Sequence, residues 1–532
     1  MKKSTIPLII TLIFSFILYY SISPALNIHS GELWFIIIST IITFIILYVF
    51  LQLLSSFNKK NRANKNTSTE LPIKIAFFAL GGSLVILLVG ILIGIKPFRA
   101  STYASLAQGR IEDRNFLNDI KEEEISNIAL MDTASAEIIG NRQMGSLSDL
   151  VSQFETSDYS TITVNNKPLK ASALSYVNFF RYLSNKDIGI PGYIQVNPVS
   201  QKAEYIKFEK GLKYVPSAFF SEDLKRHIHS KYPTAIIDSY YFELDEEGKP
   251  HYISPYYIYR AGLFGAKDVG GAIIVDPITG DMEKYSLEDI PAWVDRVYDG
   301  DLLAKQYDWY GTLKNGYWNS LFAKKGSVVT TDDYGYKSLE NDIWVFTGVT
   351  SVSSDESNIG FVLMNSRTGA INYYDIYGAE EYSAMSAAEG QVQNLRYKAS
   401  FPSIINVDGE PVYIMVLKDS GGLTKMYAIV NLQDYSLVAT GDTQQEVLDN
   451  YKKRLGVSSG DKDSLEHSIT ITVDSIKFGN IDGNTYAYLI SGETAYRLLL
   501  KENEEVVLIN PGDEVTLLTQ DTDVLIKQAI LD

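Results

Sequence analysis

The chain has 532 residues, no cysteine and a formal net charge of −17. Without cysteine it has neither disulfides nor thiolate chemistry, and a zinc site would depend on histidines and carboxylates alone. Residues 1–99 hold nine basic and two acidic side chains, a balance of +7, and the remaining 433 residues carry −24. This acidic majority argues against a nucleic-acid partner, and the length predicts several domains.

Three apolar stretches near the N-terminus are each about long enough to span a bilayer. They cover Ile6 to Ile22, Leu33 to Leu54 and Ile75 to Ile95. Basic residues precede the first stretch and fill the loop after the second, at Lys59, Lys60, Arg62 and Lys65, whereas the loop between the first two has none. The positive-inside rule therefore predicts a cytoplasmic N-terminus and an extracytoplasmic chain after about residue 100. Cleavage of the first stretch as a signal peptide would leave this orientation unchanged.

Gly90 and Gly94 in the third stretch form a small-xxx-small pair. Such a pair lets two helices approach closely, which predicts self-association or a contact within the chain. The three stretches contain no Asp, Glu, His or Arg, so they offer no proton relay or ion path, and transport is disfavoured.

Asp132-Thr133-Ala134 resembles the Asp-Thr-Gly turn of pepsin-like and retroviral aspartic proteases, with alanine in place of glycine. That chemistry needs two carboxylates that share a proton, and the sequence has no second copy. Asp132 serves equally well as the N-cap of a helix that follows it. An extracytoplasmic hydrolase is therefore the alternative to a binding protein.

The Gly271–Tyr285 segment predicts a hairpin, because a β-branched strand ends at Asp276-Pro277 and Gly280 closes the turn. Three other apolar strands also end on Asn. They are the strands that begin at Tyr193, Phe361 and Tyr427. Two longer segments, 221–287 and 379–441, share a helix followed by an antiparallel meander, with Pro250 and Pro411 at equivalent strand starts. A surface loop from Ala261 to Gly270 would absorb their difference in length.

Two groups of residues suggest chemistry or binding. Asp289 and Pro291 open a helix to about Tyr310, and the loop after it, Trp309 to Trp318, is rich in aromatics that suit sugar rings or peptide. Paired carboxylates near this loop would suit a glycan-acting enzyme, and the candidates are Asp295, Asp299, Asp301 and Asp308.

His227 and His229 are two residues apart, which places them on different sides of a helix, and His251 belongs to a strand. The sequence thus indicates no metal and no cofactor.

Residues 456–466 form a Ser-, Gly- and Asp-rich linker. After it, about six short strands, one of them at Val506 to Ile509, predict a small β-barrel of OB or SH3 type. The expected fold is three transmembrane helices, an α+β extracytoplasmic region and this barrel. The expected domains are residues 1–99, 100–215, 216–310, 311–455 and 467–532.

The two helix-plus-meander units, with Gly248-Lys-Pro250 or Gly409-Glu-Pro411 before the central hairpin, resemble PepSY domains. More of the chain, including Asp132 to Gly145 and Ser386 to Gln393, is similar to an uncharacterised family of Gram-positive membrane proteins. The PepSY resemblance implies an extracytoplasmic protein that binds or regulates envelope components, such as peptidases. Neither resemblance supplies catalytic residues. We therefore expect a membrane-anchored, non-catalytic envelope protein whose partners are envelope proteins or cell-wall components.

Overall fold

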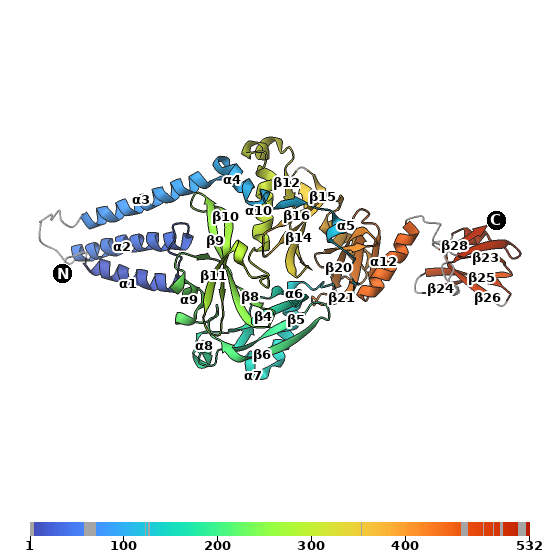
Figure 1. The fold of residues 1–532 in the computed structure, drawn as a ribbon, viewed down its shortest axis with the longest axis horizontal. Coiled ribbons are helices and arrows are strands. Elements are labelled where there is room, and N and C mark those ends of the chain that lie inside the picture. Colours follow the sequence, from blue (N-terminus) through green and yellow to red (C-terminus); the bar gives the residue numbers. More distant parts are fainter. Residues whose placement is uncertain are drawn as a thin grey trace. The chain divides into compact units, whose positions relative to one another are not determined.

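The structure is a computed structural model of the chain (Figure 1). It describes residues 5–57, 71–122, 124–125, 128–352, 354–458, 467–481, 484–492, 494–500, 504–519 and 528–531. The chain divides into two compact units, Met1–Tyr451 and Lys452–Asp532. The basic loop at residues 59–65 and most of the linker at 456–466 lie outside the described residues.

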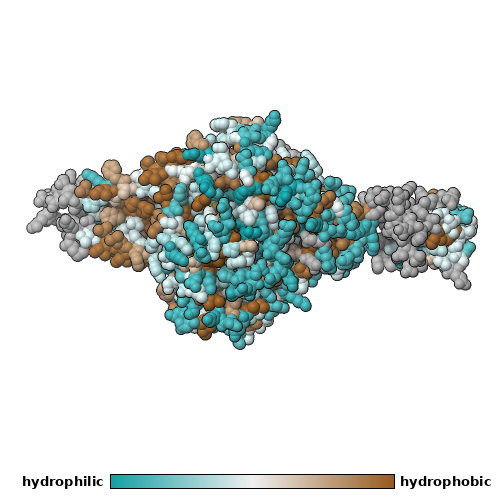
Figure 2. All heavy atoms as spheres, in the orientation of Figure 1, coloured by the Kyte–Doolittle hydropathy of each residue, from teal (hydrophilic) through white to brown (hydrophobic). Residues whose placement is uncertain are grey.

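The first three helices are α1 (Thr5–Ile22), α2 (Gly31–Phe57) and α3 (Leu71–Gly94). Each is long and apolar enough to cross a membrane, with mean hydropathies of 2.0, 2.6 and 2.7. Figure 2 shows hydrophobic side chains gathered over these helices. The three predicted spans are therefore confirmed in length and composition.

A mixed α+β region follows, and it begins with α4 (Lys96–Gln108), β1 (Ile111–Asp113) and α5 (Phe116–Asp119). Its first sheet follows α6 (Thr133–Ser146) and α7 (Ser148–Val151). The strands of this sheet are β2 (Phe154–Thr156), β3 (Ser160–Val164), β4 (Lys167–Tyr176), β5 (Ile190–Asn197) and β6 (Lys202–Leu212). Helix α8 (Phe179–Asn185) lies between β4 and β5. The second sheet follows α9 (Leu224–Lys231). Its strands are β7 (Ile236–Ile237), β8 (Tyr241–Leu244), β9 (Pro250–Ala261), β10 (Gly265–Val275) and β11 (Met282–Ser286).

The third sheet follows α10 (Gly300–Leu313). Its strands are β12 (Val328–Thr330), β13 (Gly335–Leu339), β14 (Asp342–Ser351), β15 (Ser354–Asn365) and β16 (Ile371–Tyr374), joined by β17 (Gly378–Ala379) and, in parallel, by β1. The fourth sheet follows α11 (Glu381–Gln391). Its strands are β18 (Lys398–Ala399), β19 (Ser403–Val407), β20 (Glu410–Lys418), β21 (Thr424–Asn431) and β22 (Val438–Gly441), and α12 (Gln444–Ser458) comes after it.

The five consecutive strands pair in the same order in all four sheets. The first two orders are β2-β4-β5-β6 and β7-β9-β10-β11, and the last two are β12-β14-β15-β16 and β18-β20-β21-β22. The remaining strand, β3, β8, β13 or β19, pairs with the first long strand of its sheet. Segments 221–287 and 379–441 therefore pair their strands in the same order, and two further segments do so as well.

Local turn chemistry also corresponds among the four sheets. A side-chain oxygen at the end of the second long strand accepts hydrogen bonds from the backbone N–H groups two and three residues later, which forms an Asx turn. The residues that accept are Asn197, Asp276, Asn365 and Asn431. In three sheets the preceding hairpin has a two-residue turn with positive φ at both positions, as a type I′ turn requires. Those turns are Asn165-Asn166, Glu340-Asn341 and Asp408-Gly409.

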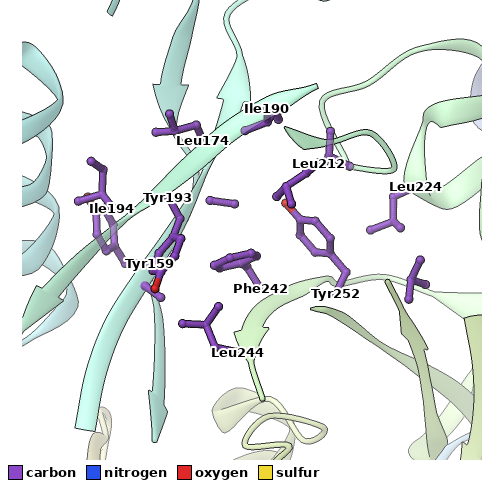
Figure 3. Packing of buried hydrophobic residues seen from close by; sticks show 14 of the residues in the cluster. Tyr159, Leu174, Ile190, Tyr193, Ile194, Leu212, Leu224, Phe242, Leu244 and Tyr252 are labelled. Atoms are coloured by element: carbon purple, nitrogen blue, oxygen red, sulfur yellow. The ribbon is translucent and has the colours of Figure 1, made fainter. Parts of the chain in front are cut away.

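Alternating side chains bury both faces of the inner sheets. Ile273 of β10 faces a core shared with the first sheet, whereas Ile274 faces a core shared with the third. Likewise, Val362 of β15 belongs to the core shared with the second sheet, and Phe361 to the core shared with the fourth. Figure 3 shows Tyr193 of β5 among Phe242 and Tyr252 from the second sheet. The sheets are therefore held together by cores that lie between successive neighbours.

The hairpin of β9 and β10 is longer than its counterpart in the fourth sheet, and the predicted surface loop from Ala261 to Gly270 is wrong. β9 and β10 have 12 and 11 residues, and β20 and β21 have 9 and 8. The extra residues extend the paired strands, and their tip contacts α3. The Leu263 N–H donates to the Gly90 carbonyl at 3.1 Å, and a Cβ on Gly94 would lie 2.6 Å from the Ala261 oxygen.

Two predicted elements differ from the structure. The helix expected from Asp289 begins only at Gly300, where Asp299 accepts a hydrogen bond from the Asp301 N–H, and Leu287–Asp289 is a short 3₁₀ turn. The strand expected at Val506 to Ile509 is instead a 3₁₀ helix over Glu504–Leu508. The capping residue at Asp289 thus belongs to a short 3₁₀ turn, and the β-branched pair near Val506 lies in a short 3₁₀ helix.

In its described residues, the second unit has six strands in two three-stranded antiparallel sheets. They are β23 (His467–Thr472), β24 (Ser475–Ile481), β25 (Asn484–Ser491), β26 (Thr494–Leu499), β27 (Glu514–Thr519) and β28 (Gln528–Leu531). The sheet orders are β23-β27-β28 and β24-β25-β26, and one core contains side chains from both. Among the described residues no pairing joins the two sheets, so the structure confirms a small β unit without establishing a closed barrel.

Candidate functional site

Asp132 has a structural role in this fold. It is the N-cap of α6 and accepts a hydrogen bond from the Ser135 N–H at 2.8 Å. Its carboxylate also forms an ion pair with Lys418 at the end of β20. Burial alone would raise the pKa of Asp132, but the Lys418 and Ser135 hydrogen bonds outweigh burial and lower that pKa. The side chain therefore joins the first and fourth sheets as a charged cap.

The acidic residues near the predicted aromatic loop are also held by backbone groups. Asp299 caps α10 and accepts from the Tyr241 hydroxyl at 3.2 Å, and Asp308 accepts from the Thr330 N–H at 2.7 Å. Asp295 is 2% exposed and accepts from the Thr163 N–H at 2.5 Å. Asp301 is exposed on the first turn of α10. The sequence offered these four residues only as candidates for the alternative, a glycan-acting enzyme. Three of them have the hydrogen-bond partners of structural carboxylates.

A closed polar cluster lies where the first, second and third sheets meet. Glu243 of β8 is fully buried and accepts from the N–H groups of Asp295 and Arg296, both at 2.9 Å. Burial raises the pKa of Glu243 to about 8 and raises the pKa of Asp295 as well. Lys170 of β4, whose pKa burial lowers to about 8, donates to Thr161 at 2.9 Å. Because these side chains are buried, the cluster joins sheets and does not form an open site.

The three histidines at positions 227, 229 and 251 have separate partners. His227 lies 2.7 Å from the Gly280 carbonyl oxygen, and His229 lies 2.9 Å from the Ala235 carbonyl oxygen. His251 lies 3.1 Å from the Asp245 carboxylate. Among the described residues, no group of three or more His, Cys, Asp or Glu side chains is arranged to hold a metal ion.

The predicted aromatic loop does not form one platform. Trp309 is buried against Tyr103 of α4, with ring centroids 4.8 Å apart in an edge-to-face geometry. Only Trp318, 66% exposed, stacks openly, on Phe322. Part of the predicted surface is therefore core that attaches α10 to α4.

The structure instead presents a groove beside the fourth sheet. It has a volume of about 920 Å³ and is formed by three segments. Its lining residues are Tyr377, Gly378, Ala379, Tyr382, Ser383, Ser386, Ala387, Gln433 and Tyr435. Three of them are exposed tyrosines, and none of these described lining residues carries a carboxylate, amine, guanidinium or imidazole. We call this feature the tyrosine groove.

The walls of the tyrosine groove are fixed by hydrogen bonds at its base. The Ala379 N–H donates to the Leu432 carbonyl at 2.8 Å, which ties β17 to the segment that carries Gln433 and Tyr435. The Ala379 carbonyl accepts from the Tyr413 hydroxyl at 3.1 Å. On α11, Ala384 and Ala388 face the core, so helical periodicity directs Tyr382, Ser383 and Ser386 outward. The aromatic side chains thus stand on a preorganised backbone.

Sequence reasoning missed the tyrosine groove because its three segments are separated along the chain. The only local signal was tyrosine next to small residues at 377–387, and tyrosine is common throughout this sequence, with 36 copies. Only the pairing of β17 with β15 and the Asx turn at Asn431 bring Tyr377 and Tyr435 to the same groove.

No known protein family and no curated protein matches the chain. Among solved structures, two variants of B. megaterium levansucrase are 10% and 9% identical, cover 79% and 83% of this chain and 97% and 96% of theirs, and have TM-scores of 0.16 and 0.18. Bacillus subtilis levansucrase is 8% identical over 77% of this chain and 98% of its own, with a TM-score of 0.15. These scores are too low to indicate a shared fold.

Proposed function

We propose that this chain is a membrane-anchored binding or regulatory protein of the cell envelope, and that the tyrosine groove is its binding site. The groove is the observation that carries this proposal. Exposed tyrosines provide rigid apolar area with a polar end, which is why they are enriched where proteins bind partners. Ser383, Ser386 and Gln433 add neutral hydrogen-bonding groups beside them.

The chemistry of the groove favours binding over catalysis. Ser383 and Ser386 could act as nucleophiles only beside a general base, and the described residues that line the groove include no carboxylate or imidazole. Aromatic grooves with neutral hydrogen-bonding groups suit an extended, proline-containing peptide, because such a segment needs little ordering on binding. The proposed ligand is therefore an extended segment of another envelope protein.

Two further observations support an envelope role. A helix followed by five antiparallel strands paired in one order occurs in four sheets, which is compatible with the PepSY resemblance and with duplication of one unit. The basic residues before α1 and after α2 favour an extracytoplasmic position for everything after α3. The groove would then face the envelope.

Site-specific photocrosslinking in membranes tests the proposal. A benzophenone amino acid at Tyr435, which is 56% exposed, should capture a partner protein, whereas the same probe at Leu395, 45% exposed and outside the groove, should not. Tyr377→Ala and Tyr382→Ala should each reduce the adduct formed at position 435. If a muramidase removes the mass that crosslinking adds to the chain, the ligand is a glycan and the proposed peptide is replaced. Equal crosslinking at positions 435 and 395 would reject the groove as a site.

A further inference from the structure

A second apolar surface lies on α8, on the residue after β4 and on the segment that follows β6. Its exposed side chains, which we call the α8 surface, are Val177, Phe180, Leu183, Phe219 and Phe220, at 42%, 74%, 41%, 38% and 49% exposure. Scattered apolar residues are normal on a protein surface, but a contiguous group marks an interaction site. This surface is separate from the tyrosine groove, so its role does not depend on the function proposed above.

The aromatic rings of the α8 surface are packed against one another. The ring of Phe179 lies 5.8 Å from that of Phe180, 5.0 Å from that of Phe219 and 5.9 Å from that of Phe220, centroid to centroid. The Tyr182 hydroxyl beneath them donates to the Phe219 carbonyl at 3.1 Å and to Glu222 at 2.8 Å. The rings are therefore held in place while they remain exposed.

Contacts with Arg226 place this surface beside the C-terminal end of α1. The guanidinium of Arg226 donates to the Tyr20 carbonyl at 3.2 Å and lies 4.3 Å from the centre of the Tyr20 ring. The same guanidinium donates to the Phe220 carbonyl. Tyr20 is in the last turn of α1, and Figure 1 shows α9, which carries Arg226, at that end of the helix. Phe220 is thus one side chain away from the end of α1.

The residues around this junction have the character of a membrane interface. Tyr19 and Tyr20 are each 41% exposed in the last turn of α1, the position at which aromatic residues mark the boundary between hydrocarbon and water. Arg181 on α8 and Lys186 after it supply positive charge beside the exposed rings, as phosphate headgroups would require. Phe220 also has a φ of +59°, a conformation that bulky residues avoid and that is often associated with a functional constraint.

We propose that the α8 surface inserts into the headgroup region of the leaflet at the outer end of α1. The partner is the lipid bilayer itself. The spans already provide the anchor, so the role of this surface is to orient the first two sheets against the membrane. Aromatic side chains that enter the interface, with cationic side chains beside them, are the pattern that membrane-surface elements use.

The absence of cysteine allows a direct depth measurement on the full chain. Phe180→Cys would carry a nitroxide label in nanodiscs of phosphatidylcholine and phosphatidylglycerol, and the label's collision rates with oxygen and with a water-soluble nickel chelate would be compared. We expect the label to lie about 5–10 Å below the phosphates, with higher oxygen and lower nickel accessibility than in water. Val177→Cys should behave in the same way.

Leu395→Cys is the control, because Leu395 is 45% exposed in the turn that follows α11. It should be accessible to nickel in nanodiscs. The proposal is overturned if the labels at positions 180 and 177 have the same accessibility as the label at 395. It is also overturned if spin–spin broadening shows that position 180 contacts a second copy of the chain.

Discussion

At the scale of single residues, Asp132 separates the binding hypothesis from the hydrolase alternative. Asparagine is as good an N-cap as aspartate, so Asp132→Asn should retain the cap of α6 and lose only the attraction to Lys418. Asp132→Ala removes both and should cost about 1 kcal/mol more in the free energy of unfolding. Thermal unfolding of the purified chain in detergent would measure the difference. A peptidase activity that disappears in a folded Asp132→Asn variant would contradict the binding hypothesis.

Glu243 predicts a pH dependence with a definite sign. Its pKa is raised from 4.5 to about 8, so between these values the folded chain holds a proton that the unfolded chain releases. Stability contributed by this group therefore falls as the pH rises through that window. Glu243→Gln has no such proton to release. Between pH 5 and 8 the free energy of unfolding of this variant should therefore fall less than that of the parent, by on the order of 3 kcal/mol.

The matched control is Glu209→Gln on the exposed face of β6, which should follow the parent chain across the same pH range. At low pH the Glu243→Gln variant should be less stable than the parent chain. Its amide has only one oxygen and cannot accept from both the Asp295 and Arg296 N–H groups in the arrangement that the carboxyl uses. A pH slope equal to that of the parent would show that Glu243 remains ionised in the folded state.

At the scale of elements, the contact between α3 and the β9–β10 hairpin depends on glycine. A Cβ on Gly94 would lie 2.6 Å from a backbone oxygen, whereas a Cβ on Gly82 would meet nothing within 4 Å. Gly94→Ala should therefore loosen the hairpin tip and raise its hydrogen-exchange rate, and Gly82→Ala should not. Gly90→Ala should have the smaller effect of the two close positions, because it meets the movable Leu263 side chain.

The same variants test the predicted self-association through Gly90 and Gly94. Since residues 261–263 cover these glycines, a second copy of the chain would have to displace Leu263. If the glycines mediate a dimer, Gly90→Ala and Gly94→Ala should reduce chemical crosslinking between copies in membranes. If they serve the hairpin, crosslinking should stay the same while hairpin exchange increases.

Elements with strong local signals were predictable from the sequence. The spans follow from apolar length, and the four strand ends follow from Asp or Asn placed after a β-branched run. The start of α10 was not predictable, because Asp289 and Asp299 have equally good capping chemistry and only packing of Leu303 and Tyr307 in the core between the second and third sheets selects the second. The loop expected from Ala261 to Gly270 was inferred only from the difference in length between two segments. Pairing with β9 makes most of it strand β10. The tyrosine groove could not be predicted from the sequence, because tertiary structure alone brings its three segments together.

At the scale of the whole molecule, orientation in the membrane can be measured with single cysteines. Tyr435→Cys should react with a membrane-impermeant maleimide in intact cells, because the positive-inside rule places it outside. Asn61→Cys, in the basic loop after α2, should react only after the cells are permeabilised. The opposite pattern would place the tyrosine groove in the cytoplasm and exclude an envelope partner.

Because the second and third sheets are covered on both faces, the order of synthesis matters for this chain. The faces of these sheets that their C-terminal neighbours bury, including Ile274 and Phe361, remain uncovered until those neighbours have been made. Partly made chains that expose apolar sheet faces are prone to aggregation. Translation or export that pauses between two sheets would leave such a face open to solvent. The nascent protein therefore depends on prompt delivery of each next sheet, or on a chaperone that shields the last one made.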